Sequence, residues 1–287
     1  LVVCDDGSTD ATLDILERFR AKAPFAVKIY RNEINLGFTK NFEKALLKCS
    51  GNLLFLSDQD DVWSNNKLSV VEKTFLANST KLLVVSDGNL TDEYLNWHGA
   101  TALSQVLSGF GTSDALVGGA LTALRKEYLL IALPIPDGIS GHDVWLHDLA
   151  RQLGTRLVLD KSLQIIRRHS SNSSNWVASS VKKINRFDVF KSQQKTCVAS
   201  GYEDRILINQ STSERLALIS AQRNDFSKKT INKNLAYLTQ ELRALQLRNR
   251  IPYANFMKRK AMAILMLLIG DYRFFNGYKS FFRDMAR

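Results

Sequence analysis

Short apolar runs alternate with amphipathic stretches through the first 60 residues of the chain. Two runs of strand length lie at residues 1–4 and 53–56, and residues 27–30 alternate between apolar and polar positions as a half-buried strand does. Helical spacing of apolar residues appears between them, in Leu13, Leu16 and Phe19 and again over residues 38–48. The order strand, helix, strand, helix, strand predicts an α/β fold with a mostly parallel sheet and helices on both faces.

Carboxylates follow two of these predicted strands directly. Asp5 and Asp6 come after the first, and Asp58, Asp60 and Asp61 come after the third. The carboxyl ends of parallel strands meet at one edge of a sheet, where open α/β sheets bind ligands. Crowded carboxylates repel each other, and a divalent cation relieves that repulsion. The pattern predicts a metal-assisted site for a phosphate-bearing substrate, with a solvated acidic turn as the alternative.

Charge divides the chain into two parts. Residues 1–177 carry 18 Lys and Arg against 20 Asp and Glu, whereas residues 178–287 carry 21 against 8. The whole basic excess therefore lies in the second part, where leucines at helical spacing predict helices. We expect an α/β catalytic domain over residues 1–177 and a mainly helical basic region over residues 178–287.

A basic cluster stands beside apolar and aromatic residues in this second region. Lys258, Arg259 and Lys260 are followed by an apolar run at 261–269 and by aromatic residues over 272–282. This order is typical of peripheral attachment to an anionic membrane surface. Two alternatives stay open: the apolar faces pack on the first domain while the lysines are solvated, or they form a dimer contact. Nucleic acid is not expected, because no motif for it occurs and the acidic sheet edge would repel phosphate.

Two further features of the sequence bear on the protein's cellular location. The longest apolar run, 261–269, has about half the length needed to span a membrane. Cys4, Cys49 and Cys197 lack the spacing of a metal site and are read as reduced thiols. We therefore expect a cytoplasmic protein, peripheral on the inner face of the cell membrane if the basic region binds lipid.

Five short motifs in order resemble the family-2 glycosyltransferases of the GT-A fold, in particular their bacterial rhamnosyltransferase-like branch. They are Cys-Asp-Asp-Gly-Ser-Thr-Asp at 4–10, Asn-Leu-Gly at 35–37, Ser-Asp-Gln-Asp-Asp-Val-Trp at 57–63, Gly-His-Asp-Val-Trp-Leu at 141–146 and Arg-Arg-His-Ser-Ser-Asn at 167–172. The resemblance covers roughly residues 1–177. In this family another strand and helix precede the first motif, so we expect a unit of about thirty to forty residues before residue 1.

The resemblance implies roles for the acidic residues. Asp5 or Asp6 would contact the nucleobase of a nucleotide-sugar donor. Asp58 and Asp60 match the D-x-D element that holds Mg²⁺ or Mn²⁺, with Asp60 as the principal ligand and Asp58 also near the donor. Asp61 would support the site or touch the donor.

Later motifs supply the remaining roles that the resemblance implies. Asp143 stands where the family keeps its catalytic base; the alternative is that Asp143 caps the helix that follows it. His169 would complete the metal shell or hold the diphosphate, unless it is a hydrogen-bonded structural histidine. Arg168 would contact the donor.

Two adjacent glycines complete the candidate site. Gly118 and Gly119 would let the backbone approach the donor sugar, because neither has a side chain. A plain turn before a strand at 121–124 explains them equally well.

The resemblance implies a metal-dependent glycosyltransferase, with a nucleotide-sugar donor and a surface-polysaccharide or lipid-linked glycan as acceptor. A single base without a second nucleophile predicts an inverting reaction, and the family branch suggests rhamnose as the sugar. The alternatives are a nucleotidyl or phosphoryl transferase on a similar sheet, or an inactive GT-A-like binding protein. The absence of a Gly-rich phosphate loop in the sequence counts against the first of these.

Overall fold

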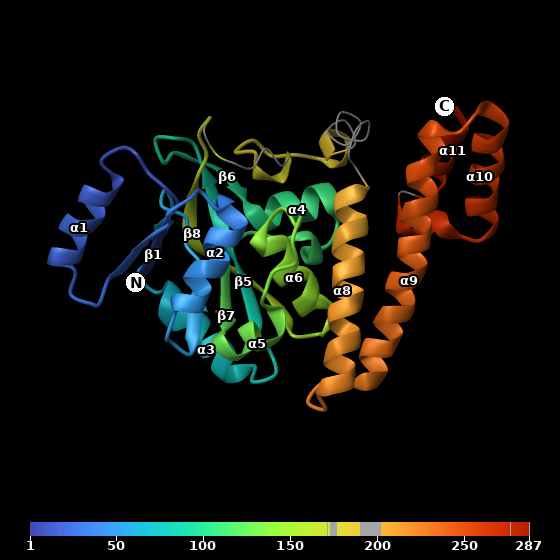
Figure 1. The fold of residues 1–287 in the computed structure, drawn as a ribbon. Coiled ribbons are helices and arrows are strands. Elements are labelled where there is room, and N and C mark those ends of the chain that lie inside the picture. The colour runs from blue at the N-terminus through green and yellow to red at the C-terminus, as the bar shows by residue number, and fades with distance from the viewer. Residues whose placement is uncertain (171, 173–176, 190–201, 276, 287) are drawn as a thin grey trace. The chain divides into compact units, whose positions relative to one another are not determined.

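The computed structural model divides the chain into two compact units, Leu1–Gln193 (unit 1) and Gln194–Arg287 (unit 2). The division lies later than residue 177, because Ile184 and Val189 are buried with Val106 in the core of unit 1. Cys197 lies outside the described residues. The structure describes residues 1–170, 172, 177–189, 202–275 and 277–286 (Figure 1).

Unit 1 begins with the predicted alternation of strands and helices. The elements are β1 (Val2–Asp5), α1 (Thr12–Lys22), β2 (Lys28–Arg31), α2 (Gly37–Lys48) and β3 (Leu53–Phe55). Strands β1 and β2 pair in parallel and form a small sheet of their own. Helix α1 buries none of its residues, and Phe19 of its predicted apolar face is exposed.

The larger sheet is mixed, which corrects the expectation of a mostly parallel sheet. Its strand order is β3-β7-β5-β8-β4, and β6 pairs with β5. Only β5 and β8 run parallel among the described strands of this sheet, because β7 inserts antiparallel between β3 and β5 and both β4 and β6 pair antiparallel. The additional strands are β4 (Val62–Trp63), β5 (Leu83–Thr91), β6 (Trp97–Thr101), β7 (Thr122–Arg125) and β8 (Arg156–Arg167).

Helices cover both faces of this sheet, as predicted. Neighbouring residues of a strand point to opposite faces, so Val84 packs with Phe75 of α3 (Lys67–Ala77) while Val85 packs with Val106 of α4 (Ala102–Phe110). Helix α6 (His142–Gln152) buries Trp145 and lies in contact with α2. The short helix α5 spans Leu129–Ala132.

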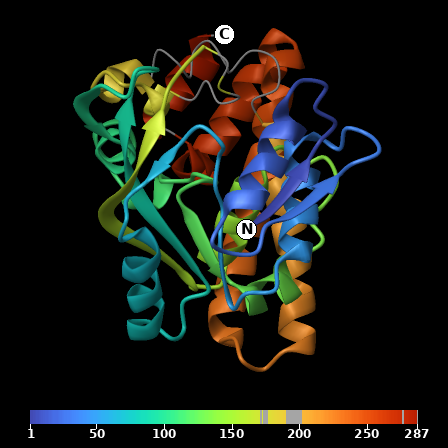
Figure 2. The same ribbon diagram turned by 90° about the vertical axis from the view of Figure 1, so that its left-hand side faces the viewer.

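The long strand β8 is strongly curled, as Figure 2 shows in yellow-green. Its register with β5 shifts on both sides of Asp87, and such bulges increase the local twist of a pair of strands. The Asp87 carboxylate accepts hydrogen bonds from the backbone N–H groups of Gly88 and Leu103, at 2.7 and 2.8 Å. The curl carries the end of β8 toward the acidic turn that follows β3, since Arg167 bonds to Asp61.

Unit 2 is helical, which confirms the expectation for the C-terminal region. It contains α8 (Glu203–Gln222), α9 (Lys228–Arg250), α10 (Phe256–Leu268) and α11 (Tyr278–Ala286). Its core joins Ala244 and Ile251 with Met266, Tyr272 and Phe274. None of the helices in the described parts of the chain has the length and apolar character that crossing a membrane requires.

Candidate active site

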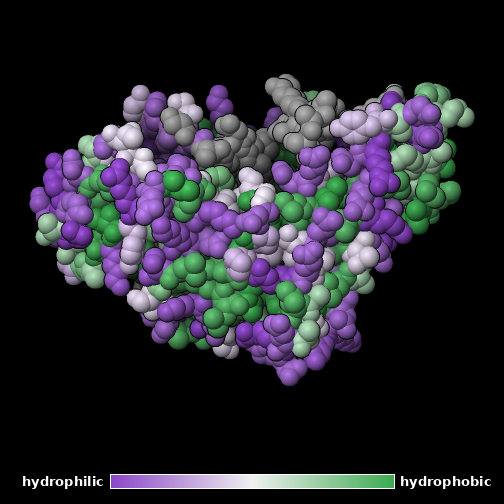
Figure 3. Space-filling model, viewed as in Figure 1, coloured by the Kyte–Doolittle hydropathy of each residue, from purple (hydrophilic) through white to green (hydrophobic). Residues whose placement is uncertain are grey.

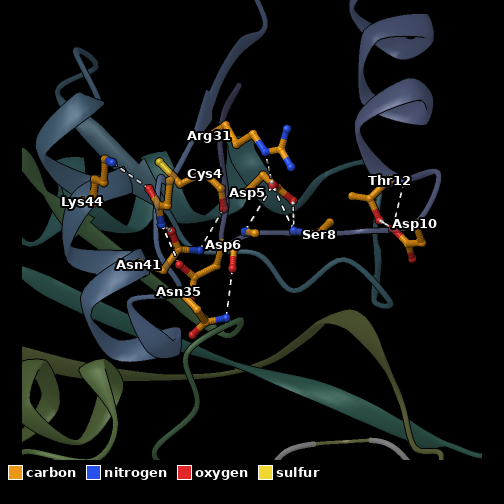
Figure 4. Close-up of polar contacts among 12 residues, drawn as sticks. Cys4, Asp5, Asp6, Ser8, Asp10, Thr12, Arg31, Asn35, Asn41 and Lys44 are labelled. Atoms are coloured by element: carbon orange, nitrogen blue, oxygen red, sulfur yellow. Dashed lines mark hydrogen bonds and ion pairs between the residues drawn. The ribbon is translucent and has the colours of Figure 1, made fainter.

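The first acidic group forms a tight turn at the end of β1 (Figure 4). Asp5 is buried, and its carboxylate accepts hydrogen bonds from the backbone N–H groups of Gly7 and Ser8 at 3.3 and 3.2 Å. Gly7 has a φ of 94°, which glycine adopts without strain. The exposed Arg31 guanidinium stands 3.9 Å from Asp5. Asp5 therefore shapes the turn, and its oxygens are already engaged.

Asp6 lines a pocket of about 700 Å³ together with Gly7 and residues 31–35. Its Oδ1 accepts hydrogen bonds from the Asn32 amide at 2.7 Å and from the Leu36 N–H at 2.8 Å. Burial opposes ionisation of Asp6, but these bonds outweigh it and lower its pKa. The Asn35 amide donates to the Asp6 carbonyl at 2.9 Å. A fixed carboxylate and several amides in one open pocket can recognise the polar edge of a ligand.

A buried amide holds this pocket against α2. Asn32 donates to Asn41 at 2.9 Å and accepts a hydrogen bond from Lys44 at 2.7 Å. Asn41 in turn donates to the Cys4 carbonyl at 2.8 Å, so α2 is tied to the tip of β1 (Figure 4). Sequence reasoning missed Asn32, Asn41 and Lys44, although the Asn-rich turn at 32–35 was a signal for a polar pocket.

The second acidic group follows β3. Asp60 Oδ2 lies 2.8 Å from His169 Nε2 and accepts a hydrogen bond from the Asn172 amide at 3.1 Å. The side-chain oxygen Oδ1 of Asn172 accepts a hydrogen bond from the His169 backbone N–H at 2.7 Å. The motif at 167–172 is thus folded onto Asp60, although Ser171 of this motif lies outside the described residues.

Asp61 is hydrogen-bonded to strand β8. Its two oxygens accept hydrogen bonds from the Gln164 amide at 2.8 Å and from the Arg167 backbone N–H at 3.1 Å. Burial, with further contributions from the charges of Asp58 and Asp60, raises the pKa of Asp61 to about 6. Arg168 lies close to this group: burial lowers the pKa of its guanidinium, and the charges of Asp60 and Asp61 oppose that change.

Lys67 supplies a buried positive charge behind the acidic turn. Its ammonium donates to the Ala120 carbonyl at 3.0 Å and to the Gln164 side-chain carbonyl, and it lies 4.0 Å from the centre of the Trp63 ring. Burial lowers its pKa to about 8, while Asp61 and Asp58 act in the opposite direction. The hydrogen bonds of Lys67 connect three elements: α3, which carries Lys67, the turn that precedes β7, and strand β8, which carries Gln164. Neither Lys67 nor Gln164 was identified from the sequence.

Asp58 brings the proposed cation ligands near the proposed base. The Asp58 side chain is exposed at the surface. Protein atoms nevertheless surround its carboxylate closely enough to remove part of its hydration. This desolvation, together with the charges of Asp60 and Asp143, raises the pKa of Asp58. Asp143 lies in the first turn of α6, and the residue that caps this helix is Gly141. The alternative in which Asp143 is the helix cap is therefore wrong.

The glycines at 118 and 119 are packed closely against side chains of the protein. A Cβ atom on Gly119 would lie 2.8 Å from His142 Nε2, and one on Gly118 would lie 3.1 Å from Leu121 Cδ1. The space beside these glycines is filled by the protein's own side chains. Because the His142 ring stacks on Phe42 of α2 at 3.9 Å, α2 connects the pocket at Asp6 with the helix that carries Asp143.

The residues around Asp60 suit a divalent cation in charge and in donor chemistry. Carboxylate oxygens and an imidazole nitrogen are ligands for Mg²⁺ or Mn²⁺. A cation would relieve the carboxylate repulsion that, after burial, raises the pKa of Asp58. Within the part of the chain that the structure describes, no group of three or more His, Cys, Asp or Glu side chains is already arranged to hold a metal ion. Asp58, Asp60 and His169 are therefore candidate ligands rather than an assembled cluster.

Comparison with known proteins identifies the first part of the chain. Residues 1–115 match the family model of Glycosyl transferase family 2. Over these residues the chain is similar to the glycosyltransferases of family 2. The match includes the acidic turns at Asp5–Asp6 and Asp58–Asp61, and it confirms the enzyme class expected from the sequence over these residues.

Relatives of the glycosyltransferase domain are distant. An uncharacterized glycosyltransferase of Nostoc sp. is 26% identical over 196 residues, which cover 64% of this chain and 60% of that protein. EpsE of Bacillus subtilis, whose name describes it as a glycosyltransferase, is 28% identical over 106 residues, which cover 37% of this chain and 38% of EpsE. The chain spans about half the length of the curated relatives it matches.

The fold is shared with a solved structure. TarS 1-349 of S. aureus, solved in complex with UDP, superposes with a TM-score of 0.52 at 17% identity, and the match covers 84% of this chain and 61% of TarS. At this identity the comparison shows the fold alone. It confirms the GT-A-like architecture expected for the glycosyltransferase domain.

Proposed function

We propose that this chain is a metal-dependent glycosyltransferase that moves a sugar from a nucleoside-diphosphate sugar to a hydroxyl group of a surface-polysaccharide or lipid-linked glycan. The observation that carries the proposal is that the motif at 167–172 folds onto the acidic turn after β3, with His169 Nε2 2.8 Å from Asp60 Oδ2. Asp143 also lies near this turn, since burial and then the charges of Asp60 and Asp143 raise the pKa of Asp58. Candidate cation ligands and a candidate base therefore lie together in a chain whose first 115 residues match Glycosyl transferase family 2.

Each group has a distinct task in this reaction. The pocket at Asp6 would receive the nucleobase, because its amides and carboxylate can pair with a polar ring edge. Asp60, Asp58 and His169 would hold Mg²⁺ or Mn²⁺, which neutralises charge on the departing diphosphate. Arg168, near the acidic group, would contact the same phosphates.

Asp143 would act as the general base. It takes the proton from the acceptor hydroxyl as the hydroxyl oxygen bonds to the anomeric carbon and the bond to the diphosphate breaks. One displacement without a second nucleophile inverts the configuration at that carbon. Neutral His142 leaves Asp143 without a cationic neighbour on that side, since burial lowers the pKa of His142 more than the charge of Asp143 raises it.

Nucleotide binding tests the proposal directly. Titration calorimetry of the chain with UDP, dTDP and GDP, each with and without Mn²⁺, should show metal-dependent binding of one nucleotide. A panel of the corresponding nucleotide-sugars, including dTDP-rhamnose, then tests rhamnose as the sugar. Release of pyrophosphate instead of a glycoside would favour a nucleotidyl transferase, and a folded chain that binds no nucleotide would refute the donor site.

Asp60→Asn gives the sharpest test of the cation ligands. The substitution keeps the side chain's shape but removes the charge, so metal-dependent nucleotide affinity should fall about tenfold or more. Asp160→Asn is the matched control, because Asp160 is an exposed carboxylate on β8. Equal affinity in both variants would show that Asp60 does not hold the cation.

A further inference from the structure

Helix α10 carries two opposite apolar faces. The inner face packs on the core of unit 2 through Ala263 and Met266, which are fully buried. The outer face is exposed: Met257 retains 74% and Leu268 retains 80% of its accessible surface. We call the outer face the α10 stripe, and it consists of Met257, Ala261, Ile264, Leu265 and Leu268.

The α10 stripe is continuous along the helix. Its members are spaced by four, seven, eight and eleven residues from Met257, so at 3.6 residues per turn they lie on one side. The stripe runs for about 16 Å at a rise of 1.5 Å per residue. Figure 3 shows hydrophobic side chains gathered over α10 and α11, and Tyr278 and Phe282 of α11 are also exposed.

Positive charges border the stripe on both sides. Lys258 follows Met257 by one residue and Lys260 precedes Ala261 by one, so at about 100° per residue the two lysines flank the stripe. Residues 251–270 contain no Asp or Glu.

The nearest acids do not offset this charge. Asp271 is buried against Arg243 at 2.7 Å, and Asp284 is buried against Arg248 at 2.8 Å. The surface around the stripe therefore presents positive charge without exposed carboxylates between residues 251 and 286.

We infer that the α10 stripe docks on an anionic lipid surface, with the helix lying in the membrane interface. An exposed apolar stripe with lysines on both edges fits a layer of acyl chains below anionic headgroups. A second copy of this chain fits less well, because pairing two stripes would bring their lysines together. With 13 residues, α10 is too short to span the membrane.

Vesicle flotation of the full chain tests this inference. We expect binding to vesicles of three parts phosphatidylcholine to one part phosphatidylglycerol, and little binding to phosphatidylcholine alone. Leu268→Ser should weaken the partition coefficient about tenfold or more, because the leucine no longer enters the acyl layer. Leu130→Ser, at an equally exposed leucine of unit 1, is the matched control and should have no effect.

A second variant tests the contribution of the lysine charges to membrane binding. Lys258→Gln should weaken binding about fivefold at low salt on the anionic vesicles. If the chain does not bind them, if it binds neutral vesicles equally, or if Leu268→Ser binds like Leu130→Ser, the inference is wrong. A dimer in sedimentation velocity that Leu268→Ser dissociates would overturn it in favour of self-association. The assay contains no nucleotide or metal, so its outcome is independent of the glycosyltransferase proposal.

Discussion

Lys67 gives unit 1 a measurable dependence of stability on pH. Burial lowers its pKa from an ordinary value of 10.5 to about 8 in the folded chain. Between these values the unfolded chain holds a proton that the folded chain has released, so the free energy of unfolding rises with pH. A gap of about 2.5 units corresponds to roughly 3 kcal/mol, gained from about pH 8 to pH 10.5.

The substitution Lys67→Met should abolish this alkaline gain. At pH 7 it removes the cost of burying a charge, but it leaves the Ala120 and Gln164 oxygens without their donor, at about 1–3 kcal/mol each. We therefore expect a variant that is no more stable than the native chain at pH 7 and falls roughly 3 kcal/mol further behind it by pH 10.5. The pH-dependent difference isolates the titration of Lys67 from the packing change.

Urea unfolding followed by tryptophan fluorescence measures this difference in unit 1, since all four tryptophans lie before residue 194. Lys258→Met, at an exposed lysine of unit 2, is the control and should leave the pH profile unchanged. An equal alkaline gain in Lys67→Met and in the native chain would refute the assignment of a depressed pKa to Lys67.

Three further substitutions test the candidate site. Gly119→Ala places a Cβ atom 2.8 Å from the His142 ring, so it should cost about 1–3 kcal/mol in urea unfolding, whereas a stability loss below this range would show that the ring moves freely. Asp143→Asn should retain nucleotide binding in calorimetry but lose about a hundredfold or more in sugar transfer, and an active variant would exclude Asp143 as the base. Asn32→Ala removes a donor to Asp6, so it should raise the pKa of Asp6 and weaken nucleotide binding about tenfold; unchanged affinity would separate the pocket from the donor.

The sequence predicts local structure in unit 1 well, because the signals are local. Runs of apolar residues and helical spacing anticipate β1 to β3 and the helices between them. The same reasoning fails for the relative direction of the strands in the larger sheet, because β7 comes from a distant part of the chain and pairs between β3 and β5. Strand periodicity is the same in parallel and antiparallel pairs, so it cannot indicate which neighbours a strand will have.

Buried polar partners are the larger omission from the sequence analysis. Lys67 and Gln164 are 97 residues apart, and their hydrogen bond is invisible to any rule based on spacing. A lysine at the start of a helix is ordinarily a solvated residue. Only the fold shows that Lys67 lies behind Asp58 and Asp61 and supplies a buried positive charge near them.

Gly119 has a packing contact that its spacing in the sequence does not reveal. A glycine near a candidate site suggests that a ligand needs the missing side chain's space, yet the His142 ring takes that space here. The two residues are linked through packing: the ring is held between Gly119 and Phe42, and this places the adjacent Asp143 at the start of α6. A side chain at 119 would displace the His142 ring, so we expect the effect of such a substitution on transfer to follow that displacement rather than the size of the donor sugar.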